Sequence, residues 1–171
     1  TTTSGCGQGT VFGDLMEDLD KVQLSNAYNL SQEVLYGVMD QVRKHESVYK
    51  QAGAVHGCAL CSNSGENRGE ILLFVEDVGR HNAVDTIAGQ MWLHGMTGDD
   101  KIFYTTGRLT SEMVIKCAQM GIPVLVSRSG LTQMGHEIAQ KLNITMLGRC
   151  QGKHYLLYTG AHRFNTLNDT Q

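Results

Sequence analysis

The stretch KIFYTTGRLTSEMVIKCAQMGIPVLV, residues 101–126, decides the fold class of this chain. Residues 101–104 and 121–126 predict buried strands, and residues 111–119 between them predict a helix. A strand, a helix of about ten residues and a second strand form a crossover that places two strands parallel in one sheet. The stretch therefore predicts an α/β fold with a largely parallel sheet that helices cover on both faces.

The same alternation continues on both sides of this stretch. Ser31 is a candidate helix cap, Leu30 and Leu35 are spaced as a hydrophobic staple, and Gly53 is a candidate stop for that helix. Apolar runs and helical spacing predict the other elements: strands at 54–61, 70–75, 144–147 and 155–158, and helices at about 82–94 and 132–142. We divide the chain into a mobile cysteine loop with its lead-in segment, residues 1–30, and an α/β sandwich domain, residues 31–171.

Composition places the chain among globular domains and excludes several function classes. Of its 171 residues 41% are hydrophobic, and no apolar run reaches the roughly 18 residues of a membrane span. The net charge of −3 argues against a general nucleic-acid binder, whose affinity comes largely from neutralising phosphates. Residue 1 is Thr and not Met, so we expect the chain to begin inside a longer polypeptide. Nothing resembles a secretory signal, and we expect a cytoplasmic protein that binds neither membrane nor nucleic acid.

Charge is distributed unevenly along the chain. Residues 1–127 carry nine Lys and Arg against fifteen Asp and Glu, whereas residues 128–171 carry five against two. His136, His154 and His162 also lie in this C-terminal quarter. A locally basic region suits a phosphate-bearing small molecule. The alternative is an uneven scatter of surface charge, and the sequence leaves both open.

Five cysteines, an odd number, do not indicate a disulfide framework and are typical of a reducing cytosol. Cys58 and Cys61 form a C-x-x-C within a predicted strand, where residues three apart face opposite ways. Buried structural thiols are therefore favoured over a redox pair and over a zinc site completed by His56. Cys117 lies on the apolar stripe of a predicted helix, which indicates a place in the core.

The other two cysteines lie in polar surroundings. Cys6 is flanked by small residues that let a loop swing, so its thiol is either a carrier that receives and delivers a group or a stray cysteine at a disordered end. Cys150 lies just after a predicted strand, in the segment RCQGKH, residues 149–154. Arginine, lysine, histidine and main-chain amides suit phosphate oxygens, although a solvated hairpin turn explains this segment equally well.

Polar, glycine-rich loops at residues 76–82, 105–112 and 127–130 each follow a predicted strand and precede a helix. In open α/β sheets, ligands bind outside the carboxyl ends of the strands, where such loops gather. The basic loop residues are therefore candidates for a ligand crevice: Arg80, His81 and Arg108. A structural network of ion pairs is an equal alternative, because acidic residues surround them: Glu76, Asp77, Asp85 and Glu112.

Several blocks of the sequence resemble one known family. EDVGRHNAVD, residues 76–85, closely resembles the signature of the FdhD family, the formate dehydrogenase accessory sulfurtransferases. GRLTSEMV, residues 107–114, and GIPVL, residues 121–125, resemble its next two blocks, in the right order and at similar spacing. TTSGCG, residues 2–7, resembles the lead-in to the family's cysteine loop. The likeness runs from about residue 1 to residue 165.

This resemblance implies a three-layer α/β/α sandwich of the cytidine-deaminase-like type, with a mixed, mostly parallel sheet, a homodimeric state and no zinc chemistry. It implies that Cys6 accepts sulfur as a persulfide from a cysteine desulfurase. The sulfur then passes to the client cofactor of formate dehydrogenase, Mo-bis(molybdopterin guanine dinucleotide) or its tungsten counterpart, and no cofactor is bound permanently. The segment that matches the family's cofactor contacts consists of Arg149, Cys150, Gln151, Gly152, Lys153 and His154.

The chain departs from the family pattern at one position. The family loop normally reads C-x-x-C, whereas Gly9 stands where the second cysteine belongs. Three explanations stay open: one thiol suffices, Cys58 or Cys61 supplies the second thiol, or sulfur transfer is impaired. The first alternative function is a non-catalytic chaperone that delivers the cofactor without modifying it. The second is a zinc hydrolase on the same fold, which the poor set of metal ligands disfavours.

Overall fold

Residues 17–45 and 55–166 are described by this computed structural model, and within them six strands form the central sheet. The strands are β2 (His56–Ser62), β3 (Ile71–Asp77), β4 (Lys101–Thr105), β5 (Val124–Ser127), β6 (Thr145–Gln151) and β7 (His154–Thr159). The helices are α2 (Gln32–His45), α3 (Arg80–Leu93), α4 (Ser111–Gln119) and α5 (Gln133–Lys141). A short parallel pair is formed by β1 (Leu30–Ser31) and β8 (Phe164–Asn165), and a 3-10 turn, Ala161–Arg163, precedes β8.

The sheet is mixed, in the order β3-β2-β4-β5-β6-β7. β4, β5 and β6 pair in parallel, whereas β2 runs antiparallel to both of its neighbours and β7 runs antiparallel to β6. Because β3 and β4 both run against β2, they point the same way as β5 and β6. The expected mixed, mostly parallel sheet is therefore confirmed in strand direction, although β2 lies between β3 and β4 and interrupts the run of parallel neighbours.

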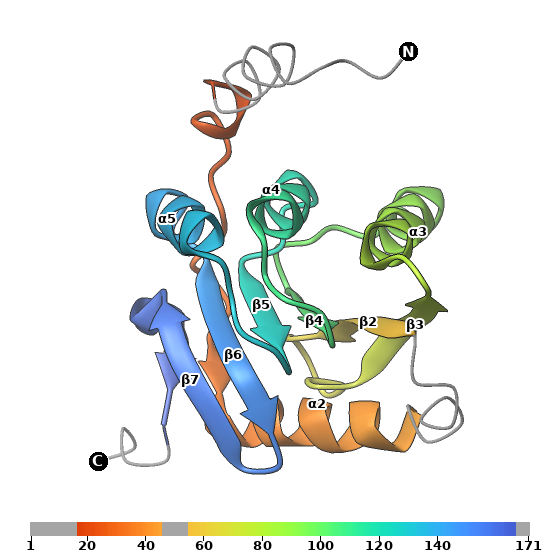
Figure 1. Cartoon of the computed structure of the whole chain (residues 1–171). Helices are drawn as coiled ribbons and strands as arrows, with labels where there is room; N and C mark the ends of the chain where they lie inside the picture. Colours follow the sequence, from red (N-terminus) through yellow and green to blue (C-terminus); the bar gives the residue numbers. More distant parts are fainter. Residues whose placement is uncertain (1–16, 46–54, 167–171) are drawn as a thin grey trace.

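Helices cover both faces of the sheet and complete the expected three-layer sandwich. α3, α4 and α5 lie on one face, and α2 crosses the other (Figure 1). The predicted cap of α2 is confirmed, because the Ser31 hydroxyl accepts a hydrogen bond from the Val34 N–H at 3.2 Å; the predicted stop at Gly53 lies outside the described residues. None of the helices in the described ranges has the length and apolar character needed to cross a membrane.

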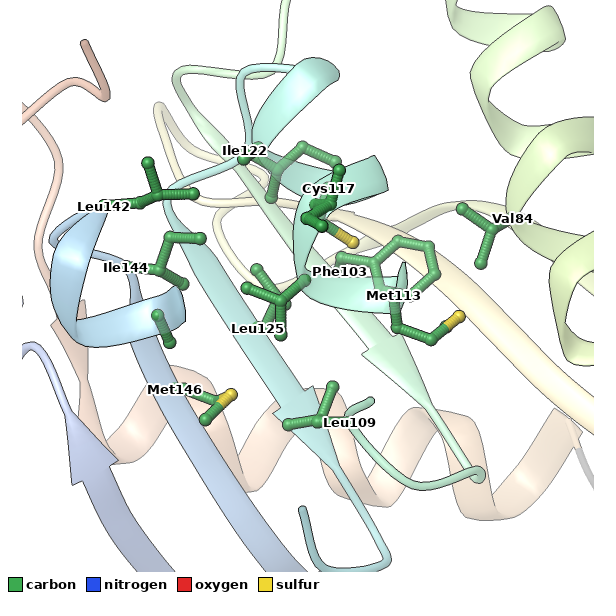
Figure 2. Packing of buried hydrophobic residues seen from close by; sticks show 14 of the residues in the cluster. Val84, Phe103, Leu109, Met113, Cys117, Ile122, Leu125, Leu142, Ile144 and Met146 are labelled. Atoms are coloured by element: carbon green, nitrogen blue, oxygen red, sulfur yellow. The ribbon is translucent and has the colours of Figure 1, made fainter. Parts of the chain in front are cut away.

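Each face of the sheet builds its own hydrophobic core. On β4, Phe103 belongs to the core beneath α3, α4 and α5, while Ile102 and Tyr104 belong to the core against α2. This alternation follows from the period of two along a strand. Figure 2 shows the first core, where Phe103 and Leu125 of the sheet lie under Met113 of α4. Each fully buried large apolar side chain contributes about 1.5–3 kcal/mol, so both layers are held firmly on the sheet.

The segment that precedes α2 packs onto the domain. Leu19 belongs to the core beneath α3, α4 and α5, and Leu30 is fully buried in the other core. The boundary predicted after residue 30 falls within β1, which pairs with β8 near the end of the chain. The predicted cysteine loop itself, residues 1–16, lies outside the described residues.

Candidate functional site

The loops that follow β3, β4 and β5 gather at one edge of the sheet because these three strands point the same way. Hydroxyl groups hold the loops after β4 and β5 together. Ser127 Oγ donates a 2.6 Å hydrogen bond to the main-chain oxygen of Gly107, and Ser129 Oγ donates a 2.8 Å bond to that of Thr106. The amide of Gly57, at the start of β2, donates to the Thr106 hydroxyl at 3.0 Å. The predicted convergence of these loops is confirmed.

β6 adds Arg149 to the same edge. A bulge interrupts the pairing of β6 with β7 after Gly148, and Arg149 has a φ of 54°, which turns its side chain out of the sheet. Its amide donates a 2.9 Å hydrogen bond to the Ser129 main-chain oxygen. Its guanidinium lies over Gly130, where a Cβ atom would stand 3.2 Å from Nη2. Arg149 is thus seated on the loop that follows β5.

The other polar residues of the predicted cofactor segment form the β6–β7 hairpin. Gln151 pairs with His154 across it, and Gly152 takes the φ of 62° that suits the first position of a two-residue turn. Gln151, Gly152, Lys153 and His154 are exposed. Tyr36 Oη, on α2, donates a 3.3 Å hydrogen bond to the main-chain oxygen of Lys153 and fixes the turn. The hairpin therefore presents two basic side chains that can contact oxyanions.

Cys150 does not belong to this polar surface. The expectation that it follows a strand in a cationic setting is wrong, because β6 continues to Gln151 and only 2% of Cys150 is exposed. Its thiol lies in the core against α2, and burial raises its pKa to about 12. β6 extends beyond its apolar residues because the side chains of Arg149 and Gln151 are exposed to solvent. A strand accommodates polar side chains on its exposed side.

The C-x-x-C of β2 is divided between the two cores, as the strand period predicts. Cys58 lies in the core under α3, α4 and α5, and Cys61 in the core against α2. Burial raises the pKa of Cys58 to about 11 and that of Cys61 to about 12. The sheet therefore separates the two thiols, which argues against a redox pair. Among the described residues, no group of three or more His, Cys, Asp or Glu side chains is arranged to hold a metal ion.

Cys117 is the fourth cysteine within the described residues. Cys117 is fully buried on α4, and the core role predicted from its spacing is confirmed. Desolvation is the main reason that its pKa is raised. All four cysteines of the described residues are thus buried. Cys6, the fifth, lies outside those residues.

Ion pairs account for part of the charged cluster around α3 and α4. His81 Nε2 lies 3.2 Å from Glu112 Oε2, and Lys116 Nζ lies 2.8 Å from Asp85 Oδ1, so both pairs join the two helices. Asp77 Oδ1 accepts a 2.7 Å hydrogen bond from the Gly79 amide. Arg108, on the loop after β4, is exposed. The ion-pair alternative is therefore confirmed for the pairs between α3 and α4, and the ligand crevice stays a prediction.

The sequence did not indicate two features of this edge. The sequence indicates His56 only as a zinc ligand, but His56 lies at the start of β2, beside the loop that contains Gly107. Two serines directly after a buried strand, Ser127 and Ser129, are the only sequence signal for the hydroxyls that join the loops. A hollow of about 480 Å³ lies beside α5, and one of about 410 Å³ between α3 and α4 is lined by the Asp85–Lys116 pair. Neither is lined by Arg80, Gly107 or Arg149.

Comparison with known proteins gives consistent matches. The family model described as the FdhD/NarQ family matches residues 1–165. A relative in Listeria monocytogenes, named sulfur carrier protein FdhD, is 32% identical over 163 residues, covering 94% of this chain and 60% of the relative. A relative of the same name in Bacillus subtilis is 30% identical over 161 residues, covering 94% and 59% respectively. The chain thus spans about 60% of the length of these relatives.

A solved structure shows the same fold. It is described as a formate dehydrogenase accessory protein from Desulfotalea psychrophila. The two folds superpose with a TM-score of 0.76 at 32% sequence identity, over 87% of this chain and 62% of that one.

Proposed function

This chain belongs to the FdhD/NarQ family, and from that premise we propose that it carries sulfur for the maturation of formate dehydrogenase. In this proposal Cys6 receives sulfur from a cysteine desulfurase and delivers it to Mo-bis(molybdopterin guanine dinucleotide). The partners are the desulfurase and formate dehydrogenase, and the working unit is a homodimer in the cytoplasm. The chain spans about 60% of the length of its relatives. We therefore propose, and do not infer from the comparison alone, that it has the activity of the whole protein.

The burial of the other four thiols carries the assignment of Cys6. Sulfur transfer requires a thiolate that a partner can reach. Cys58, Cys61, Cys117 and Cys150 are buried, and burial raises the pKa of each of them. At neutral pH these four thiols are protonated and enclosed by packed side chains. Cys6 is the cysteine that remains.

The loading step is a thiolate exchange. The Cys6 thiolate attacks the terminal sulfur of a persulfide on the desulfurase. The new S–S bond forms at Cys6, the S–S bond of the donor breaks, and the donor cysteine leaves as a thiolate. No electron donor or acceptor from outside is needed, because the sulfur keeps its oxidation state.

Release of the sulfur as hydrosulfide needs a second thiolate. That thiolate attacks Cys6 Sγ, a disulfide forms, and hydrosulfide leaves with the electron pair of the broken bond. Gly9 occupies the position of the family's second cysteine, and the structure argues against Cys58 and Cys61 as substitutes because they are enclosed on opposite faces of the sheet. The second thiol in this proposal therefore comes from another molecule.

The basic edge of the sheet fits the nucleotide part of the client cofactor. Arg149 presents a planar guanidinium on the loop after β5, and Lys153 and His154 are exposed on the adjoining hairpin. These groups suit phosphate oxygens, and Gln151 and Gly152 offer further polar contacts there. Cys150 is not among the residues proposed to contact the cofactor, because its thiol faces the core. The cofactor supplies the site that accepts the sulfur.

Persulfide loading tests the proposal. The full chain is incubated with a cysteine desulfurase and cysteine, and intact mass spectrometry then measures the gain of one sulfur atom. We expect the gain in the wild type and in Cys61→Ala, a matched buried control, and its loss in Cys6→Ala. A gain that persists in Cys6→Ala would overturn the assignment of the carrier thiol.

A second variant tests the release step. Gly9→Cys restores the second thiol of the family motif, and we expect it to release hydrosulfide from loaded protein without added thiol. The wild type is expected to need a small-molecule thiol such as dithiothreitol. Equal release from both proteins without added thiol contradicts the role given to the external thiol.

Gly9 also favours one other function, that of a chaperone that binds the cofactor without modifying it. The two functions separate in one measurement. Binding of the guanine dinucleotide cofactor by a chain that takes up no sulfur from the desulfurase favours the chaperone. Sulfur uptake at Cys6 favours the carrier.

A further inference from the structure

Arg80 and His56 meet over Gly107. A Cβ atom on Gly107 would stand 3.2 Å from Arg80 Cδ and 3.5 Å from His56 Nδ1. The absence of a side chain at Gly107 therefore lets the Arg80 stem lie on the loop backbone. This loop follows β4, whereas Arg80 begins α3 and His56 begins β2. Three elements that are separate in sequence thus build one small basic cluster.

The start of α3 has an unusual charge pattern. Its N-cap, Gly79, has no side chain to cap the helix, and no acidic residue lies in the first turn. Arg80 and His81 lie there instead, although the positive end of a helix dipole disfavours cations. By contrast, α4 and α5 are capped by the hydroxyls of Thr110 and Thr132. A bound anion would offset the repulsion at this helix end.

Two atoms of this cluster lack partners. Arg80 Nε and His81 Nδ1 are buried, and neither has a hydrogen-bond partner among the described residues. Leaving a buried polar atom unpaired is unfavourable, so a ligand that pairs with it gains stabilisation. Two of the nearby carboxylates are engaged elsewhere: Asp77 accepts from the Gly79 amide, and Glu112 pairs with His81 Nε2. Packing therefore positions Arg80, while its Nε–H remains available to donate a hydrogen bond to a ligand.

Arg149 has an equivalent position on the next loop. A Cβ atom on Gly130 would stand 3.2 Å from Nη2 of Arg149, whereas the atom at 3.2 Å from a Cβ on Gly107 is Cδ of Arg80. The two glycine loops are joined by the hydrogen bonds of Ser127 Oγ and Ser129 Oγ. The loops form one platform, on which the Arg80 stem packs at Gly107 and the Arg149 guanidinium packs at Gly130.

We propose that Arg80, with His56 and the loop at Gly107, is a second oxyanion site that binds a phosphate or pyrophosphate group separately from Arg149. This inference rests on the proposed function only for its natural ligand. A bis-dinucleotide carries two pyrophosphate groups, and each guanidinium binds one of them. A planar guanidinium binds two oxygens of such a group at once.

Inorganic pyrophosphate is the probe for this site. Its binding to the full chain is measured by calorimetry and by the NMR signals of the arginine Nε–H groups, with Arg80→Gln assigning the Arg80 signal. We expect the Arg80 signal to shift with pyrophosphate in the wild type and to shift equally in Arg149→Gln. Arg80→Gln is expected to weaken binding at this site about tenfold or more. The Arg149 signal is expected to respond as before.

Two further variants make the result specific. Arg68→Gln removes an exposed arginine from the turn between β2 and β3, at the other end of these strands. We expect the Arg80 and Arg149 signals of this variant to shift with pyrophosphate as they do in the wild type. Arg80→Met is expected to keep the melting temperature of the wild type, because no hydrogen bond from Nε is lost. The second site is overturned if the Arg80 Nε–H signal does not shift with pyrophosphate, or if it shifts only while Arg149 is present.

Different outcomes contradict pyrophosphate binding at Arg80 and sulfur loading at Cys6. Persulfide loading of Cys6 does not involve Arg80. Loading that is intact beside an Arg80 signal that ignores pyrophosphate overturns only the second site. Pyrophosphate binding at both arginines in a chain that takes up no sulfur leaves the second site standing and overturns the carrier function.

Discussion

Arg163 Nε donates a 2.8 Å hydrogen bond to the main-chain oxygen of Ser25, which joins two residues far apart in sequence. Arg163 is 1% exposed, and its Nη1 donates to the main-chain oxygen of Asn143. The same nitrogen lies 3.4 Å from the Thr145 hydroxyl. This buried cation therefore ties the segment before α2 to the loop between α5 and β6.

Replacement of Arg163 is expected to loosen this attachment. Arg163→Met removes the donors and leaves the oxygens of Ser25 and Asn143 unpaired, so we expect the free energy of unfolding to fall by about 3 kcal/mol. Arg163→Lys keeps the charge but not the fork and is expected to lose less, about 1–2 kcal/mol. Urea unfolding measures both. A Met variant as stable as the wild type contradicts the role.

Thiol labelling is expected to distinguish Cys6 from the other cysteines. Iodoacetamide reacts with thiolates, and the four buried thiols are protonated and enclosed in the folded chain. We expect one modification on the folded protein at about pH 8, mapped by mass spectrometry to Cys6, and five after denaturation. Cys6→Ser should show none while folded. Rapid modification of Cys58 or Cys150 in the folded chain contradicts their burial.

Stability is expected to fall under alkaline conditions because of the buried thiols. The pKa of Cys58 is raised from 9.0 to about 11, so below pH 9.0 this thiol is protonated in the folded and unfolded chains alike. Above that pH the unfolded chain ionises first, and the free energy of unfolding falls by at most about 1.4 kcal/mol per pH unit for one thiol until the pH reaches the folded value.

Urea unfolding at about pH 8 and about pH 10 measures this loss. We expect Cys58→Ala to show a shallower pH dependence than the wild type. Cys6→Ser is the control, and its slope should match that of the wild type. Equal slopes in all three proteins mean that the Cys58 thiol does not cause the alkaline loss.

Two glycines are expected to differ sharply in their tolerance of alanine. In Gly135→Ala the new Cβ would lie 2.5 Å from the main-chain oxygen of Leu109, so α5 or that loop must move, at a cost of about 1–3 kcal/mol. In Gly107→Ala the nearest atom, at 3.2 Å, is Cδ of the flexible Arg80 stem. We expect the Gly107 variant to lose less than about 1 kcal/mol of stability but to displace Arg80.

Thermal melting and pyrophosphate titration measure the two effects side by side. The expected pattern is a lower melting temperature with unchanged binding at Arg80 for Gly135→Ala, and weaker binding at nearly normal stability for Gly107→Ala. If Gly107→Ala binds as the wild type does, contact between Arg80 and Gly107 is not what positions that guanidinium.

Local periodicity predicted the helices and strands well. The apolar stripe of α2, the cap at Ser31 and the opposite orientations of Cys58 and Cys61 all depend on residues a few positions apart. Cys150 was misplaced because the sequence shows polar residues on both sides of it. Arg149 and Gln151 ended the predicted strand, whereas the folded strand continues with both side chains facing outward.

The sequence by itself determined the alternation of strands and helices, the two apolar faces of the sheet and the three polar loops at the strand ends. Only the tertiary structure decided that β2 lies between β3 and β4, that Arg80 and His56 meet at Gly107, and that Arg163 reaches Ser25. The physical reason is that an element's period depends on neighbouring residues. Contacts between distant residues depend on strand order and direction, which the packing of the whole chain sets.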